Sequence, residues 1–201
     1  MGVSMEVLIA DFGHLRAVPA DQREDLLELA AFGAPDDFDT VFSEGWTWPE
    51  DAHWYARYEF RGTLTSYKAH FWAGERWEKM RPAVEPGPRN AMDEFSSSLF
   101  WGEYNWADTQ PPFTPSVPVR EERWGREAML WCPPEDVAVI HRSWVQVERG
   151  LPCLRAAFDR YAVVPSGWFP DFDSFAEFVS EWGDVVTQAA LRGWGIIGLR
   201  C

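Results

Sequence analysis

The chain has 201 residues, a net charge of −14, and a composition that is 46% hydrophobic and 16% aromatic. This balance is typical of a folded globular protein and argues against intrinsic disorder. So acidic a chain repels phosphate backbones, and no stretch approaches the roughly 18 apolar residues of a membrane span. We therefore expect neither nucleic acid nor a membrane as a partner.

The negative charge is concentrated in the first quarter of the chain. Residues 1–52 hold twelve acids and two arginines, a sum of −10, whereas residues 53–92 hold four acids and seven bases, a sum of +3. Such an acidic segment either keeps a protein in solution or steers a basic partner toward it. The three cysteines form no metal-like pair, and no secretory signal is recognisable, so we expect reduced thiols in a soluble cytoplasmic protein.

The first third of the sequence predicts one strand and two helices. Residues 3–10 form a short apolar run that ends at an aspartate, as a strand does. Residues 19–31 begin with proline, carry acids in the first turn and are followed by glycine after two residues, which predicts a helix. A second short helix is predicted over residues 36–43.

The middle of the chain is dominated by aromatic residues and shows little periodicity. Residues 54–60 alternate like a strand but also fit a helix that turns at Gly62, so both alternatives stay open. Two prolines at residues 86–88 predict a break, after which residues 90–101 form a helix. Four prolines then make residues 105–119 the longest predicted loop.

The last third has the clearest pattern. It predicts a strand at residues 128–131, helices at 134–150, 151–161 and 172–192, and a final strand at 194–199. The strands near the two ends of the chain are candidates to pair. The sequence therefore predicts an α+β fold: a single, mostly helical domain over residues 1–201, packed on a small sheet that includes the N- and C-terminal strands, with an aromatic-rich middle segment at 46–124.

Short stretches outside that segment share a pattern with a known family. They are Met1-Gly2-Val3-Ser4-Met5, Pro134-Glu135-Asp136-Val137, Leu154-Arg155-Ala156-Ala157-Phe158-Asp159, and Ala189-Ala190-Leu191-Arg192-Gly193 leading into Ile196-Ile197-Gly198-Leu199. Over residues 1–10 and 130–201 the chain resembles the YfbM-like family of small bacterial proteins of unknown function. The resemblance implies an α+β fold but no chemistry, and the aromatic-rich segment departs from the family's pattern.

Common catalytic motifs are absent from the sequence, including the nucleophile elbow, the phosphate loop, the dinucleotide fingerprint and the zinc-protease helix. His53, His70 and Glu75 lack the spacing of known zinc motifs, so we expect no metal and no cofactor. The chain is accordingly interpreted as non-enzymatic, although its sequence does not decide whether any catalysis occurs.

Two further features have both a chemical and a structural interpretation. Paired acids such as Asp171 and Asp173 suit glycoside hydrolysis, but they stand where a helix cap belongs, and we expect capping. Cys132 precedes a helix start, a position that activates thiols, yet no histidine partner is identified, and we expect a small buried residue.

The strongest candidate for a binding site is the segment from residue 53 to residue 81, where arginines and lysines interleave with aromatic residues. Aromatic walls with a few convergent polar groups make a small-molecule pocket, and arginine suits an anionic or planar ligand. The candidate ligand-binding residues are Trp54, Arg57, Tyr58, Arg61, His70, Trp72 and Trp77, with the aromatic side chains as walls and one of the two arginines at the floor. The alternative is that these aromatic residues form a core.

Two functional hypotheses follow. The first is a non-enzymatic protein-interaction module of the inhibitor or immunity kind, whose acidic first quarter binds a basic protein partner. The second is a small-molecule-binding protein or enzyme that holds an anionic or aromatic ligand in the aromatic-basic segment.

Overall fold

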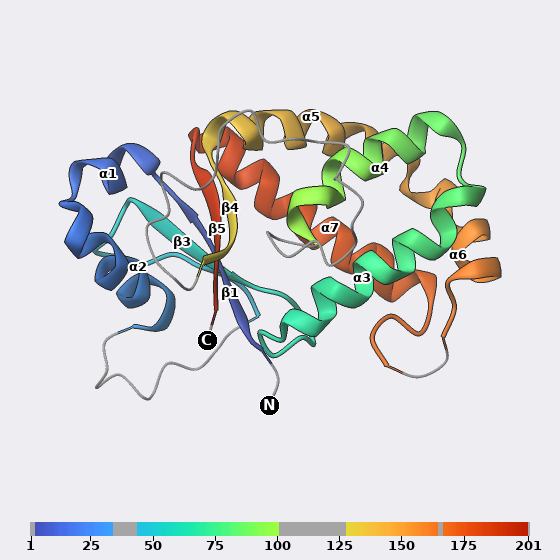
Figure 1. Cartoon of the computed structure of the whole chain (residues 1–201), viewed down its shortest axis with the longest axis horizontal. Coiled ribbons are helices and arrows are strands. Elements are labelled where there is room, and N and C mark those ends of the chain that lie inside the picture. Colours follow the sequence, from blue (N-terminus) through green and yellow to red (C-terminus); the bar gives the residue numbers. More distant parts are fainter. Residues whose placement is uncertain (1–2, 34–43, 101–127, 165–166, 201) are drawn as a thin grey trace.

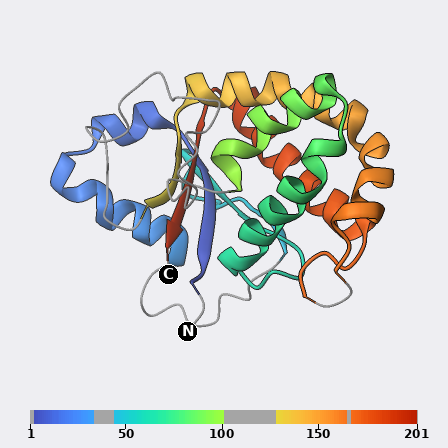
Figure 2. The ribbon, with the colours of Figure 1, turned by 45° about the vertical axis from the view of Figure 1, so that its right-hand side comes forward.

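Five antiparallel strands form the centre of the molecule, which a computed structural model describes over residues 3–33, 44–100, 128–164 and 167–200. Their order across the sheet is β2-β3-β1-β5-β4. The bounds are β1 Met5–Ala10, β2 Gly45–Thr47, β3 Tyr55–Glu59, β4 Ala128–Cys132 and β5 Gly195–Arg200. The strands near the two ends of the chain pair in the centre of the sheet, from Met5 opposite Arg200 to Ala10 opposite Gly195. Figure 2 shows β1, in blue, and β5, in red, side by side.

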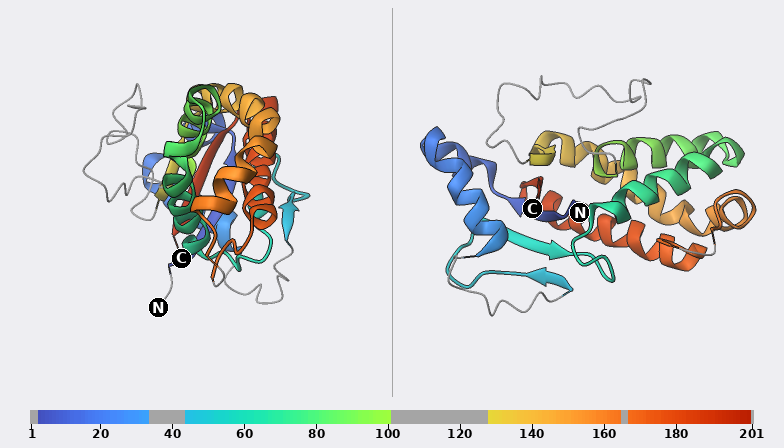
Figure 3. Two further views of the ribbon diagram at one scale, coloured as in Figure 1. Left: turned by 90° about the vertical axis from the view of Figure 1, so that its right-hand side faces the viewer. Right: turned by 60° about the horizontal axis from the view of Figure 1, so that its bottom comes forward.

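The helices lie on both faces of this sheet. They are α1 Phe12–Ala17, α2 Arg23–Phe32, α3 Tyr67–Met80, α4 Pro86–Leu99, α5 Pro134–Gly150, α6 Arg155–Tyr161 and α7 Phe172–Arg192, with short 3-10 turns η1 Ala20–Gln22, η2 Arg81–Ala83 and η3 Leu151–Leu154. In Figure 1, α1 and α2 cover one face, and α3 to α7 cover the other. Figure 3 shows α4, α5 and α7 side by side in the thicker layer. No described helix is long and apolar enough to cross a membrane.

Each face of the sheet carries its own core. The α1–α2 face holds a small cluster built around Leu8, Leu15 and Leu27, while the α3–α7 face holds a much larger one that includes many aromatic side chains. Because both faces are covered, every residue of β1 is buried, and apart from Glu6 the strand is apolar throughout rather than alternating. This packing confirms the predicted α+β fold.

Most predicted elements of the last third are confirmed. The N-cap of α7 is Asp171, whose side chain accepts a hydrogen bond of 2.8 Å from the backbone N–H of Ser174. Residues 151–161 are helical, but the proline at position 152 divides them into η3 and α6. The predicted helix at 36–43 and loop at 105–119 lie outside the described residues.

Two expectations about the middle segment need correction. The prolines at 86–88 do not break the chain: Pro86 opens α4, because the first turn of a helix has no use for its missing N–H. Within residues 54–60, Tyr55–Glu59 form the strand β3, which confirms the strand alternative. Helix α3 was not predicted as such, although its buried residues Ala69, Ala73, Trp77 and Met80 recur at helical spacing.

Candidate functional site

The candidate segment folds into β3 and α3, and the strand divides its residues between two faces. Arg57 points to the α1–α2 side, where its Nη1 donates a hydrogen bond of 3.0 Å to the carbonyl of Ala31 at the end of α2. Trp54, which precedes β3, packs against the same small core. Tyr58 points to the opposite side and joins the large core. Residues of one strand alternate between faces, so these side chains cannot share one pocket.

On the large face, Tyr58 and Arg61 fasten the sheet to α7. The hydroxyl of Tyr58 donates to Glu181 Oε1 at 3.1 Å, and the backbone N–H of Arg61 donates to the same oxygen at 3.2 Å. The guanidinium of Arg61 also pairs with Glu177 at 2.9 Å, on the exposed side of α7. Burial raises the pKa of Glu181, although both hydrogen bonds oppose the shift. These polar groups satisfy one another, and the network is structural.

His70 and Trp77 lie inside the large core. The indole N–H of Trp182 donates to His70 Nδ1 at 3.1 Å, and the rings of Phe60 and Phe178 stand edge-on to the imidazole. Burial lowers the pKa of His70 to about 3, so the ring is neutral at pH 7. Trp77 donates its indole N–H to Asp93 Oδ1 at 2.9 Å. Both residues are therefore satisfied core residues.

Trp72 differs from the other candidates because it remains 37% exposed. It lies one turn before Arg76 on α3, and the Arg76 guanidinium carbon lies 5.7 Å from the centre of its ring. The predicted pocket walled by Trp54, Tyr58, Trp72 and Trp77 over Arg57 or Arg61 is therefore not formed. Most aromatic side chains of the described part of the segment belong to the core, and those at 101–124 lie outside the described residues.

A buried charged cluster that the sequence analysis missed lies on the small face. Glu6 of β1 is 3% exposed, and it shares this face with Arg57 and Glu59 of β3. Burial raises the pKa of Glu6 to about 7, with Arg57 opposing the shift and Glu59 adding to it. One carboxylate oxygen of Glu6 has no hydrogen-bond partner. Glu6 escaped notice because it lies within the apolar run of the first predicted strand.

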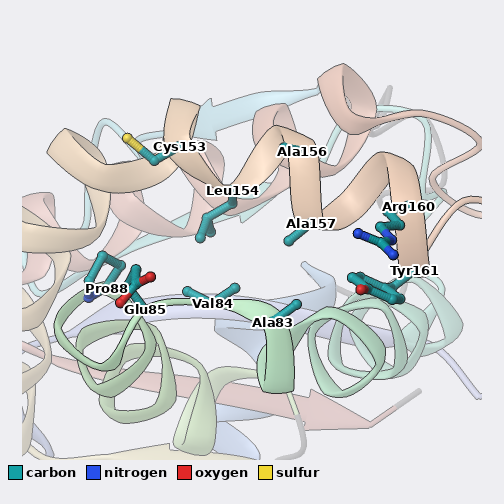
Figure 4. Close-up of a pocket in the computed structure, with 10 residues that line it drawn as sticks. All are labelled: Ala83, Val84, Glu85, Pro88, Cys153, Leu154, Ala156, Ala157, Arg160 and Tyr161. Atoms are coloured by element: carbon teal, nitrogen blue, oxygen red, sulfur yellow. The ribbon is translucent and has the colours of Figure 1, made fainter.

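A groove of about 340 Å³ opens between the η2–α4 connection and η3–α6 (Figure 4). Val84, Leu154 and Ala157 give it an apolar lining, with Cys153 near one end and Arg160 near the other. Its volume falls at the lower limit of ligand pockets. The two walls come from segments about 70 residues apart in sequence. The shared stretch at residues 154–159 predicts a helix but no chemistry, so no sequence signal marked the groove.

The remaining chemical candidates are structural where the structure describes them. Burial raises the pKa of the Cys132 thiol well above its ordinary value, which opposes a nucleophilic role. Asp173 forms an ion pair with Arg155, while Asp171 caps α7. The described residues contain no group of three or more histidines, cysteines and acids arranged to hold a metal.

A comparison with protein-family models, with curated proteins and with solved structures finds no match. The arguments about function below therefore rest on the geometry of the chain itself.

Proposed function

We propose that the protein is a non-enzymatic interaction module that binds a basic partner protein through the exposed face of α2. The observation that carries the proposal is the composition of this face. Leu29 and Phe32 are 50% and 40% exposed, and Asp25 and Glu28 are exposed beside them. At 100° per residue these four positions share one side of the helix. Exposed apolar side chains bordered by like charges are typical of a binding surface.

The charge of this face is not balanced by α2 itself. Arg23 is the one basic residue of the helix, and its Nε and Nη2 donate to the carbonyls of Val18 at 2.8 Å and Arg16 at 3.0 Å. Position 23 lies on the other side of the helix from Phe32. The acids beside Leu29 thus favour a partner that presents lysine or arginine around an apolar contact.

The opposite side of α2 holds the surface in place. Leu27, Ala30 and Ala31 are buried against the sheet in the small core. Because α2 is already fixed on the sheet, its backbone does not have to become ordered when a partner binds, which reduces the entropic cost of binding. This arrangement supports an inhibitor or immunity kind of role in the cytoplasm, where an acidic surface neutralises a basic one.

Charge reversal on α2 tests the proposal. Partners are captured at low salt with wild type and with the double variant Asp25→Lys/Glu28→Lys. The matched control, Glu148→Lys/Asp159→Lys, changes two exposed acids on α5 and α6, so both variants raise the net charge from −14 to −10. We expect the control variant to bind the same partner as wild type, and the α2 variant to bind it at least roughly tenfold more weakly. We also expect added salt to release the partner from wild type.

A second pair of variants tests the apolar part of the surface. Leu29→Ala/Phe32→Ala leaves every charge in place, and we expect it to weaken the same partner by a faster dissociation rate. If no partner binds wild type at low salt, or if the α2 and control variants bind it equally, the proposal is wrong.

A further inference from the structure

Arg76 is a buried cation that forms no ion pair with any residue in the described part of the chain. It lies on α3, is 1% exposed, and uses Nη2 to donate a hydrogen bond of 2.9 Å to the carbonyl of Trp168. Its Nε and Nη1 have no hydrogen-bond partner. Nη1 alone carries two protons, so several of the donors of this guanidinium face no acceptor. Buried N–H groups are nearly always paired, and an unpaired one calls for a physical reason.

The positive charge of Arg76 is also poorly compensated by its described neighbours. Burial is the largest effect on its pKa and lowers it, and the adjacent acid Glu75 opposes this without forming an ion pair with it. By contrast, Arg81 one turn later holds both carboxylate oxygens of Asp93, at 2.6 and 2.8 Å. Two arginines of one segment thus have opposite surroundings, because among the described residues Arg81 pairs with an acid and Arg76 does not.

The site of Arg76 lies close to the surface. One of its neighbours is the ring of Trp72, 5.7 Å from the guanidinium carbon and 37% exposed. Another is Trp168, which is partly exposed and lies in the segment that leads into α7 (Figure 1). A flat cation beside the exposed indole ring of Trp72 is an arrangement that suits planar or anionic groups.

We infer that Arg76 is the anchor of a binding site for a small ligand that carries an oxyanion, either a carboxylate or a phosphate group. The oxyanion accepts hydrogen bonds from the unpartnered nitrogens and supplies the missing negative charge, while Trp72 contacts the rest of the ligand. Arginine remains charged at all physiological pH values, so deprotonation offers no other relief. The site is separate from the α2 face and stands without the partner proposed there.

Thermal unfolding in different salts tests this inference. Wild type is titrated with sodium phosphate and, separately, with sodium propionate, against sodium chloride at equal ionic strength. We expect at least one oxyanion to raise the unfolding temperature saturably, by about 5–10 °C at a hundredfold excess over its Kd. A shift with phosphate alone identifies a phosphate-bearing ligand, and a shift with propionate alone identifies a carboxylate.

Two variants locate the effect. Arg76→Met should abolish the shift, whereas the control Arg160→Met, which removes an exposed arginine of α6, should retain it. If Arg76→Met does not fold, Arg76→Lys keeps the charge but loses the planar fork, and it should reduce the shift to less than half. An absent shift in wild type with both oxyanions, or an undiminished shift in the Arg76 variant that folds, would overturn the inference.

Discussion

The two faces of the sheet bury ionisable groups in opposite ways. On the α3–α7 face, His70 sits among aromatic rings and stays neutral, with Trp182 as its hydrogen-bond donor. On the α1–α2 face, Glu6 and Glu59 are buried beside Arg57, and one oxygen of Glu6 has no partner. His70 is thus kept neutral in the thick layer, whereas Glu6 lies in a cluster of two acids and one arginine in the thin layer.

His70 and Glu6 therefore make the stability depend on pH with opposite signs. A histidine whose pKa is lowered by folding costs stability as pH falls below its unfolded value, because the unfolded chain takes up the proton first. A glutamate whose pKa is raised by folding costs stability as pH rises above its unfolded value, because the unfolded chain loses the proton first. Over the mildly acidic range the two effects oppose each other in the whole protein, and single variants are needed to separate them.

The largest expected effect belongs to His70. With the pKa falling from 6.5 in the unfolded chain to about 3 in the folded one, its penalty grows from pH 6.5 down to pH 3 and reaches roughly 5 kcal/mol. Asparagine keeps an acceptor near the position of Nδ1 but does not titrate. We expect urea unfolding at a series of pH values to show His70→Asn less stable than wild type at pH 7, with the gap closing by roughly 3 kcal/mol on going to pH 4.5.

The control for this prediction is His53→Asn, which removes an exposed histidine. Its stability should follow that of wild type across the same pH range. A constant difference between His70→Asn and wild type from pH 7 to pH 4.5 would show that His70 does not carry the acid sensitivity of the large face.

Glu6→Gln tests the small face and should give the next largest effect. The pKa of Glu6 rises from 4.5 to about 7 on folding, so its penalty is absent below pH 4.5, grows through pH 7, and then stays constant. Glutamine resembles the protonated acid at every pH. We therefore expect the variant to be more stable than wild type by roughly 3 kcal/mol at pH 8 and about equal to it at pH 4.5, measured as the free energy of unfolding in urea.

Glu28→Gln, an exposed glutamate of α2, is the matched control and should leave the stability almost unchanged at both pH values. A Glu6→Gln protein that is less stable than wild type at pH 8 would mean that the ionised carboxylate is stabilised by Arg57 more than burial disfavours it.

The third prediction compares the rigidity of the two layers through the cost of one Gly→Ala substitution in each. A Cβ added at Gly183 would lie 2.1 Å from the Trp144 ring in the thick layer, and one added at Gly195 would lie 2.1 Å from the Phe12 ring in the thin layer. Trp144 is held by a 17-residue helix packed on α4 and α7, whereas Phe12 opens a helix of six residues. We expect Gly183→Ala to cost about 3 kcal/mol and Gly195→Ala about 1 kcal/mol, since the short helix can shift.

The control is Gly87→Ala on α4, where a Cβ meets no atom within 4 Å and the backbone conformation suits any residue. It should be neutral or slightly stabilising in the same urea titrations, because alanine favours a helix by roughly 1 kcal/mol over glycine. Equal losses at Gly183 and Gly195 would indicate that both layers are equally rigid.

The sequence was sufficient for the elements whose burial is one-sided. The sequence predicts helix α7, with Asp171 or Asp173 as its cap, because apolar residues recur at helical spacing from Phe172 to Trp182 and the other side is polar. The pairing of the two end strands was also anticipated. Such patterns predict the element reliably, because a helix or strand that is buried on one face has apolar residues on that face only.

The candidate site was predicted less well, for a reason visible in β3. This strand is buried on both faces, so its alternating residues Arg57 and Tyr58 both point into protein, and the pattern gives no sign of which face holds a pocket. The segment was correctly singled out as aromatic and basic, but the unpaired guanidinium belongs to Arg76 rather than to Arg57 or Arg61. Whether a buried arginine forms an ion pair depends on residues far away in the sequence, which a local sequence pattern does not indicate.

The pairing of β1 with β5 has a consequence for how the chain reaches this structure. The partners in these two central strands are between 185 and 195 residues apart, from Ala10–Gly195 to Met5–Arg200. β1 therefore cannot pair with β5 until almost all of the described chain has been synthesised. Until then, the edge of β1 that pairs with β5 is unpaired. Closing so long a loop is slow. We accordingly expect the helical layer to form early and the β1–β5 pairing to form last. During synthesis, the mostly apolar first strand is then accessible to chaperones and prone to aggregation.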